Sequence, residues 1–405
     1  MLREGKFVVI PALALLVCAA GRAMPQEAAS PAHFANGGNA AQVPATFIDQ
    51  RVFFPVRVNG GQPSLFELDT TAKASSLDPG RASNFGLKTE AETGAAGASG
   101  QIIRNATLGL PSVEIPLPSL SVNDSPDFAR VVGQNFEGTL GADFLTRVIV
   151  QIDYAQQSVQ VYDPASFHYQ GKGVRIPFTL FGATPVIRAK FIEQSGKSGE
   201  GEFLVNTALN ASVVFSNRFA DAHKLFSGHM NSVTASDPEV DGGETVSLAR
   251  LDTFQIGSDS VIGSVATFSR TDQSAGGDPK IAGTIGGGIL RRFVVIFDYS
   301  HQQLILEPGA QFHNDDEEDK SGMALIAEGP GLKRFVVTQV QPDTPAAKAG
   351  IQKGDVVDGV DNEAAADMTL ESVRTLFRQP VRTYDVLMER NGTTYEVNLQ
   401  MRRRI

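Results

Sequence analysis

Two short stretches of this chain combine an apolar run with a polar turn that has side chains suited to acid–base chemistry. The first ends in Asp69-Thr70 and the second, much later in the chain, ends in Asn206-Thr207. Two carboxylates held side by side share one proton, and such a pair can activate a water molecule. An amide exchanges no proton at neutral pH. We therefore expect a pair built from Asp69 and Asn206 to retain a single base.

The elements around these stretches must bring them together. Residues 52–58 and 65–68 have the composition of strands, and residues 59–62 between them favour a hairpin turn that delivers Asp69 at the end of the second strand. Segment 138–154 returns as 283–299 with nearly half of its aligned positions identical. Such self-similarity indicates an internal duplication. Asn206 is then expected to occupy, in the second copy, the place that Asp69 has in the first.

Composition limits the kinds of function that the chain can have. It has 405 residues, of which 42% are hydrophobic and 20% charged, which is typical of globular domains. The formal net charge is -10 and no basic stripe is present, so we expect no nucleic-acid partner. Forty glycines and no tryptophan favour short strands and tight turns. The six histidines show no metal-ligand spacing, so we expect neither a metal nor another cofactor.

The duplicated part resembles the retropepsin/pepsin-type aspartic proteases, in the bacterial form with two lobes on one chain. Each lobe of that family has an apolar strand ending in Asp-Thr/Ser-Gly, followed near the end of the lobe by two apolar residues and a glycine. Leu68-Asp69-Thr70 and Leu140-Gly141 match in the first lobe. In the second lobe the matches are Val205, Thr207 and residues 284–286. The resemblance implies a mostly β, bilobal fold over residues 47–308.

The resemblance assigns the paired site and the ties between its two loops to four residues: Asp69, Asn206, Thr70 and Thr207. Thr71 and Ala208 stand where the family has glycine. These departures favour a degenerate protease that binds extended peptides without cleaving them. The alternative is an active aspartic endopeptidase in which Asp69 activates water. A third interpretation treats Asp69 as an ordinary turn carboxylate that accepts local N–H groups.

The tail resembles a PDZ domain, an α+β module. Residues 343–351 followed by Gly354-Asp355 carry the signature. Such domains hold a peptide's C-terminal carboxylate on backbone N–H groups of a loop, and the peptide adds a strand beside a helix. Residues 329–332 are the competing candidate for that loop, and residues 370–377 are the expected groove helix. The preferred peptide-binding residues are Ser321, Gly322, Met323, Ala324 and Leu370.

The N-terminus has the pattern of a secretory signal peptide, with basic residues, an apolar run and small residues before an expected cleavage after Ala23. Cys18 is the only cysteine and lies inside this segment, so we expect a mature chain without disulfides. We expect a periplasmic or secreted monomer without a membrane span, whose partners are peptides or protein C-termini. The expected order of parts is signal peptide (1–23), flexible leader (24–46), lobe 1 (47–165), lobe 2 (166–309), a solvated acidic linker (310–320) and PDZ domain (321–405).

Overall fold

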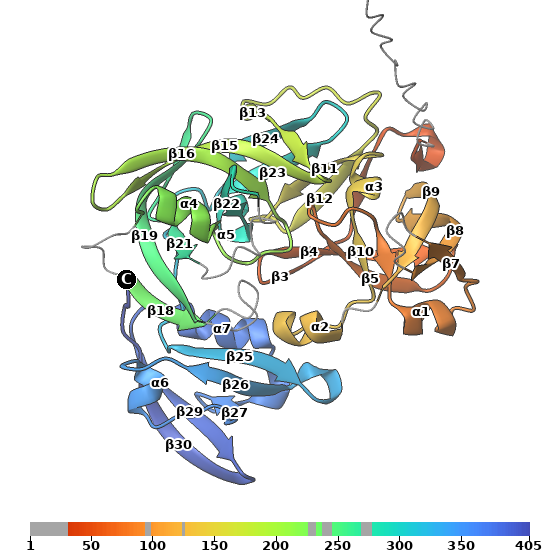
Figure 1. Cartoon of the computed structure of the whole chain (residues 1–405). Coiled ribbons are helices and arrows are strands. Elements are labelled where there is room, and N and C mark those ends of the chain that lie inside the picture. The colour runs from red at the N-terminus through yellow and green to blue at the C-terminus, as the bar shows by residue number, and fades with distance from the viewer. Residues whose placement is uncertain (1–30, 94–98, 124–125, 226–231, 237–244, 269–277) are drawn as a thin grey trace, which may run out of the picture.

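The computed structural model describes residues 31–405 except for 94–98, 124–125, 226–231, 237–244 and 269–277 (Figure 1). The expected signal peptide at residues 1–23 lies outside the described residues. Of the described residues, 49% are in strands and 14% in helices, and they form two closed six-stranded barrels followed by a separate C-terminal domain. The predicted fold class is therefore confirmed. No helix within the described ranges has the length and apolar character needed to cross a membrane.

The first lobe is a barrel closed by the pairing of β8 with β9. Around the ring the order is β4-β5-β10-β6-β9-β8. The predicted hairpin turn is confirmed, with Asn59 and Gly60 both at positive φ as a tight two-residue turn requires. The strands of this sheet are β1 (His33–Phe34), β3 (Thr46–Ile48), β4 (Arg51–Val58), β5 (Pro63–Leu68), β6 (Ser76–Leu77), β7 (Glu90–Thr93), β8 (Ser99–Leu110), β9 (Val113–Val122) and β10 (Gly138–Leu140). The helical segments are η1 (Ala35–Gly37), α1 (Pro79–Asn84), α2 (Pro126–Val132) and α3 (Ala142–Leu145).

The second lobe repeats this ring. Its order is β15-β16-β22-β17-β21-β19, closed by the pairing of β15 with β19, and each pair of neighbours has the same relative direction as in the first lobe. The strands of this sheet are β14 (Thr179–Phe181), β15 (Thr184–Glu193), β16 (Ser198–Val205), β17 (Val213–Phe215), β18 (Ser232–Ser236), β19 (Thr245–Ile256), β20 (Asp259–Ile262), β21 (Val265–Phe268) and β22 (Ile281–Ile285). The helices are α4 (Asn217–Ala222) and α5 (Gly287–Leu290). The sequence repeat is thus a repeat of topology.

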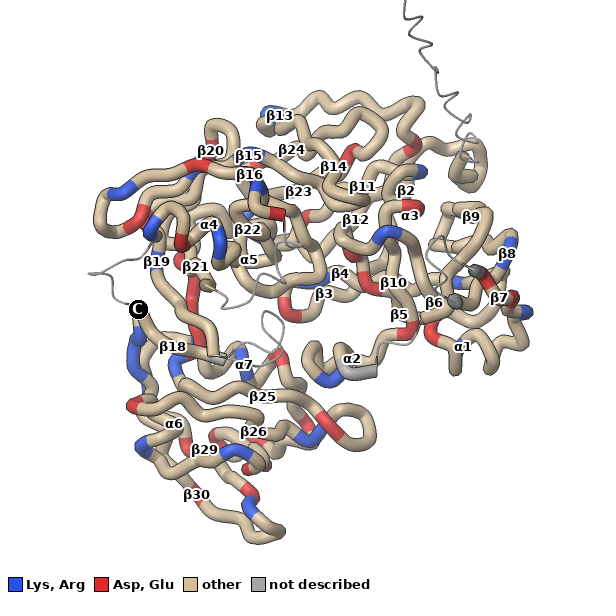
Figure 2. The backbone as a smooth tube through the Cα atoms, viewed as in Figure 1, with Lys and Arg blue, Asp and Glu red and all other residues tan. Residues whose placement is uncertain are grey.

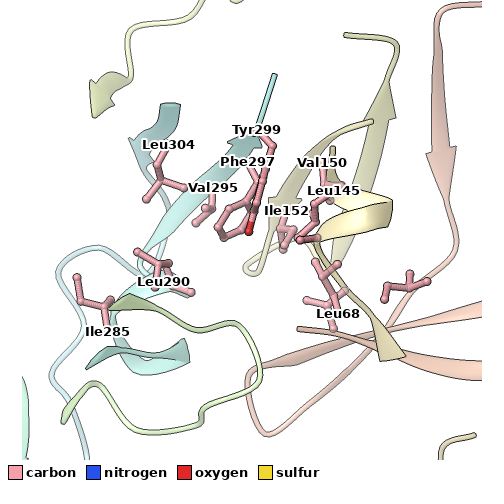
Figure 3. Close-up of a cluster of buried hydrophobic side chains, with 14 of the residues drawn as sticks. Leu68, Leu145, Val150, Ile152, Ile285, Leu290, Val295, Phe297, Tyr299 and Leu304 are labelled. Atoms are coloured by element: carbon pink, nitrogen blue, oxygen red, sulfur yellow. The ribbon is translucent and has the colours of Figure 1, made fainter. Parts of the chain in front are cut away.

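A third sheet joins the two lobes. Its order is β13-β24-β23-β11-β12-β2, and the equivalent strands β11 and β23 pair with each other at its centre. Its strands are β2 (Ala40–Val43), β11 (Ile149–Asp153), β12 (Ser158–Tyr162), β13 (Val174–Pro177), β23 (Phe293–Asp298) and β24 (Gln303–Pro308). Figure 3 shows apolar side chains of this sheet meeting Leu68 from lobe 1 and Ile285 from lobe 2 in one buried cluster. The two lobes therefore share a single core.

Part of the expected flexible leader belongs to the fold. β1 pairs with β9 of lobe 1, and β2 pairs with β12 at the edge of the joining sheet. The prediction that structure begins near Phe47 is therefore wrong for residues 33–46. Small residues such as those of β2 have weak strand propensity, and the pairing with β12 supplies what the local sequence lacks.

The C-terminal domain has its own core around the sheet β25-β26-β27-β29-β30. Its strands are β25 (Met323–Glu328), β26 (Arg334–Val340), β27 (Val356–Val360), β28 (Glu363–Ala364), β29 (Thr383–Arg390) and β30 (Thr393–Gln400). Its helical segments are η3 (Pro330–Leu332), α6 (Pro345–Lys348), η4 (Ala365–Asp367) and α7 (Leu370–Arg378). Thr344 caps α6, since its side chain accepts a hydrogen bond from the backbone N–H of Ala347.

The acidic linker is docked rather than solvated. Asp316 and Glu318 are buried, although we expected a solvated charge run. Glu318 pairs with Arg250 of β19 at 3.2 Å, and Asp316 accepts the backbone N–H of Val265 at 2.9 Å. Figure 2 shows acidic and basic residues interspersed along the described part of the chain. The partners of the linker come from strands β19 and β21, which are distant from it in the sequence. The linker thus attaches the C-terminal domain to lobe 2.

Two glycines near the ends of the duplicated strands are required by close packing. A Cβ on Gly286 would lie 2.3 Å from the carbonyl oxygen of Ala211, and one on Gly141 would lie 2.7 Å from that of Ala72. Both residues have negative φ, so the requirement is steric and not conformational. These are the glycines of the two apolar-Gly motifs recognised in the sequence.

We expect Gly286→Ala to lower the free energy of unfolding by about 2 kcal/mol, since the added methyl group meets backbone that cannot rotate away. Denaturant unfolding measures the effect. Gly100→Ala is the matched control, because a Cβ there meets nothing within 4 Å and no positive φ is involved. Equal stability of the two variants would contradict the packing argument.

Candidate functional site

The two candidate loops leave equivalent parallel strand pairs. β5 runs parallel to β10, and the N–H of Asp69 continues the ladder by donating to the carbonyl of Leu140 at 3.0 Å. β16 runs parallel to β22 in the same way, and the N–H of Asn206 donates to the carbonyl of Ile285 at 2.9 Å. Asp69 and Asn206 therefore occupy the same position in the two copies of the fold.

Thr70 and Thr207 bind the two loops to each other. The Thr70 hydroxyl donates to the carbonyl of Val205 at 2.6 Å and accepts the N–H of Thr207 at 3.2 Å. The Thr207 hydroxyl donates to the carbonyl of Leu68 at 2.6 Å and accepts the N–H of Thr70 at 3.2 Å. Both threonines are fully buried. This reciprocal pattern fixes Asp69 and Asn206 as neighbours on opposite sides of one symmetric junction.

The Asp69 side chain is held by Thr71, two residues later in the chain. One carboxylate oxygen accepts the N–H of Thr71 at 2.7 Å and its hydroxyl at 2.6 Å. Burial raises the pKa of Asp69 above its usual value, and the hydrogen bonds from Thr71 offset only part of this. A carboxyl with a raised pKa is a better base than an exposed one once it is ionised.

Asn206 has a fixed orientation. Its side-chain oxygen accepts the N–H of Ala208 at 2.7 Å, which is the counterpart of the bond from Thr71 to Asp69. An amide whose oxygen is held in this way directs its NH₂ group away from that bond, as a donor. The second position of the pair thus offers a hydrogen-bond donor and no titratable group.

The residues at the two expected glycine positions fit without strain. Thr71 puts a β-branched side chain where the family has glycine, and it has no positive φ while its hydroxyl bonds to Asp69. Ala208 is buried and supplies the N–H that holds Asn206. Both loops therefore keep a backbone conformation that side chains tolerate.

Arg51 is a site residue that the sequence did not reveal. This fully buried arginine donates to the carbonyl of Ala208 at 3.0 Å and pairs with Glu67 at 3.2 Å. It therefore ties β4 of lobe 1 to the Asn206 loop of lobe 2. A lone cation beginning the apolar run of residues 52–56 was the only signal, and its partner, a backbone carbonyl, has no signature in the sequence.

The candidate peptide-binding residues of the C-terminal domain lie on β25, in the loop before it and at the start of α7. Ser321 and Gly322 immediately precede the edge strand β25, to which Met323 and Ala324 belong, and α7 begins with Leu370. Lys320 brings the loop to the end of α7, with its N–H donating to the carbonyl of Phe377 at 3.0 Å. The competing loop, residues 329–332, lies at the opposite end of β25.

Within the described ranges, no cluster of three or more His, Cys, Asp or Glu side chains could hold a metal ion. A cavity of about 180 Å³ lies where lobe 2 meets the C-terminal domain. Asn210 and Ser212, which follow the Asn206 loop, line it on one side, and Ala324 and Arg378 line it on the other. The two candidate regions are therefore neighbours in space.

We expect Thr70→Val to lower the free energy of unfolding by about 2 to 4 kcal/mol, because it leaves the carbonyl of Val205 and the N–H of Thr207 buried without a partner. Chemical denaturation measures the loss. Thr179→Val, on the exposed strand β14, is the matched control and should change stability little. A Thr70 variant as stable as the control would contradict the reciprocal bonding.

The raised pKa of Asp69 predicts a definite pH dependence. The folded state binds the Asp69 proton more tightly than the unfolded state does. The free energy of unfolding therefore falls as the pH rises above 3.8, the ordinary pKa of an aspartate, because the unfolded state loses this proton more readily. We expect Asp69→Asn to increase stability at pH 7 and to change it least near pH 3, as measured by urea unfolding at both pH values.

Asp298→Asn is the control with the opposite sign. Burial of Asp298 is outweighed by hydrogen bonds from Gln303, Ser300 and His301, so its pKa is lowered. This variant should lose stability at pH 7. If both variants shift stability in the same direction, the assignment of a raised pKa to Asp69 is wrong.

Comparison with known proteins bears on the C-terminal part. No curated protein matches the chain. Residues 336–383 match the PDZ domain family, and the match covers β26 to the start of β29 together with α6 and α7. The C-terminal domain is therefore a PDZ domain, as its sequence predicted.

Proposed function

We propose that this protein is an exported, peptide-binding member of the aspartic-protease type in which the paired-carboxylate chemistry has been lost. The observation that carries the proposal is the state of Asn206. Its backbone keeps the ladder bond to Ile285, its neighbour Thr207 keeps the bonds to lobe 1, and only the side chain lacks an acid. The scaffold of a paired site is present while one of its two functional groups is not.

The amide of Asn206 would allow a peptide to bind but not to be cleaved. In a working pair one carboxyl is protonated and donates to the peptide carbonyl, while the other takes a proton from water. The NH₂ group of Asn206 can make the same donation, but it cannot release a proton to the leaving amine. Asp69 would then hold water or a peptide N–H without completing the reaction.

The PDZ domain supports the same class of ligand. PDZ domains bind extended chains at the edge of a sheet, and the substrates of the aspartic-protease type are also extended chains. Export rests on the signal-peptide pattern, and the partners that we propose are peptides or protein C-termini bound by a monomer. No cofactor is needed for either mode of binding.

A working aspartic endopeptidase is the second candidate. Asp69 is intact, its pKa is raised, and the threonine ties that position a pair are complete. A lone buried carboxylate can act as a general base for water, and weak cleavage would follow from it.

Peptide-library digestion by the mature protein separates the two candidates. We expect no cleavage at acidic or neutral pH, and we expect retention of library peptides on the immobilised protein. Cleavage that disappears in Asp69→Ala would establish the endopeptidase instead. The Asp358→Asn variant, changed at an exposed aspartate of β27, controls for the effect of a substitution as such.

Restoring the acid tests the cause of inactivity. We expect Asn206→Asp to give two coupled titrations, one raised and one lowered, because two carboxylates at this junction share one proton. NMR titration of labelled aspartates measures them. If the variant shows two independent, ordinary titrations, the two positions do not form a pair, and adding Thr71→Gly and Ala208→Gly tests whether the loops must also be restored.

A further inference from the structure

The PDZ groove, defined here as the space between β25 and α7, faces the two lobes. A peptide enters such a groove by pairing with the free edge of the strand and placing its carboxylate on the N–H groups of the preceding loop. β25 is an edge strand of its sheet, and among the strands that the structure describes it pairs with β26 alone. Figure 1 shows α2 of lobe 1 and β18 of lobe 2 lying between the lobes and this domain.

The backbone N–H groups of the loop before β25 already donate hydrogen bonds to a carboxylate of the chain itself. Those of Ser321 and Gly322 both donate to one oxygen of Asp319, each at 2.9 Å. The Ser321 hydroxyl donates to the same oxygen at 2.6 Å and accepts the N–H of Met323 at 3.2 Å. Asp319 therefore occupies the donors that a peptide terminus would use.

The edge of β25 is occupied as well. The guanidinium of Arg374, on α7, donates to the carbonyl of Leu325 at 2.9 Å. The same nitrogen donates to the carbonyl of Val131, in α2, at 2.9 Å. One arginine thus joins both walls of the groove to lobe 1, at the place where a ligand strand would pair.

Lobe 1 also covers the start of α7. A Cβ on Gly133 would lie 2.6 Å from the Cβ of Leu370, so the backbone of lobe 1 rests directly on this helix residue. At the far end of β25, Glu328 forms an ion pair with Arg130 of α2. Residues 130–133 therefore cross the groove from one wall, β25, to the other wall, α7.

A buried carboxylate clamps this arrangement. Asp49, in the turn between β3 and β4, pairs with Arg374 at 2.6 Å and with Arg378 at 3.4 Å. Its N–H donates to Glu371 at 2.8 Å. Burial opposes the charge of Asp49, but the arginines prevail and lower its pKa to about 2. The clamp stays charged across the ordinary pH range.

We propose that the PDZ groove is closed by the chain's own residues, with Asp319 in the loop and residues 130–133 along the walls, and that peptide C-termini bind only when the domain separates from the lobes. The class of ligand rests on the proposed function. The closure rests on the contacts alone, so the two can fail separately.

Thiol labelling of the mature chain tests the closure. The mature sequence has no cysteine, so Ala324→Cys places a single thiol in the wall of the groove. We expect adding Asp49→Asn to raise the labelling rate by a maleimide at least tenfold, because Arg374 and Arg378 lose their counter-charge. Asp358→Asn in the same Ala324→Cys background is the control. Equal rates in all three proteins would overturn the proposal.

Peptide binding gives the second readout. The probe is a fluorescent pool of random octapeptides with free C-termini, and the same pool amidated is its control. We expect Asp49→Asn to bind the free-carboxylate pool at least tenfold more tightly than wild type, with no gain for the amidated pool. Wild type binding the free pool as tightly as Asp49→Asn would overturn the closure.

The remaining outcomes are also decisive. Faster labelling without peptide binding would leave the closure standing and remove the proposed ligand class. Where Asp49→Asn fails to fold, Arg130→Gln replaces it, because Arg130 is partly exposed and its loss removes the ion pair that joins α2 to Glu328 of β25. That variant should also label faster than the control, and an unchanged rate would count against the closure.

Discussion

The structure depends on the reciprocal hydrogen bonds between Thr70 and Thr207. Each hydroxyl satisfies a carbonyl of the opposite lobe and accepts the N–H of the other threonine. Since all of these groups are buried, breaking any one leaves another without a partner. The symmetry of the barrels, the joining of β11 to β23 and the adjacency of Asp69 and Asn206 are all consistent with this single junction.

The two sides of the junction have equivalent backbone geometry but different side-chain chemistry. The backbones around Asp69 and Asn206 are equivalent, and each side chain is held through the N–H two residues later. The difference lies in one functional group, an amide in place of an acid. The junction therefore places a carboxyl and an amide at equivalent positions, and only the carboxyl can exchange a proton at neutral pH.

Much of this could be predicted from the sequence. The duplication of 138–154 in 283–299 predicted the two lobes, and the strand-end pattern predicted equivalent places for Asp69 and Asn206. The roles of Arg51 and Asp319 could not be found, because the contacts that place them at these sites involve backbone groups, which look alike at every position. Asp316 and Glu318 were interpreted as solvated because their cationic partners, such as Arg250, come from strands distant in the sequence. The bond from Thr71 to Asp69 could not be predicted, because only the structure shows the backbone conformation that allows it.

The contact of residues 130–133 with the PDZ groove has a consequence for concentration. A segment of the same chain is present at its docking site at an effective concentration on the order of millimolar, whatever the amount of protein in solution. A free peptide that enters the groove must compete with residues 130–133 at this fixed effective concentration. Diluting the protein leaves the closed fraction unchanged, so the local supply of peptide, and not the abundance of the protein, sets how often the groove is occupied by a partner.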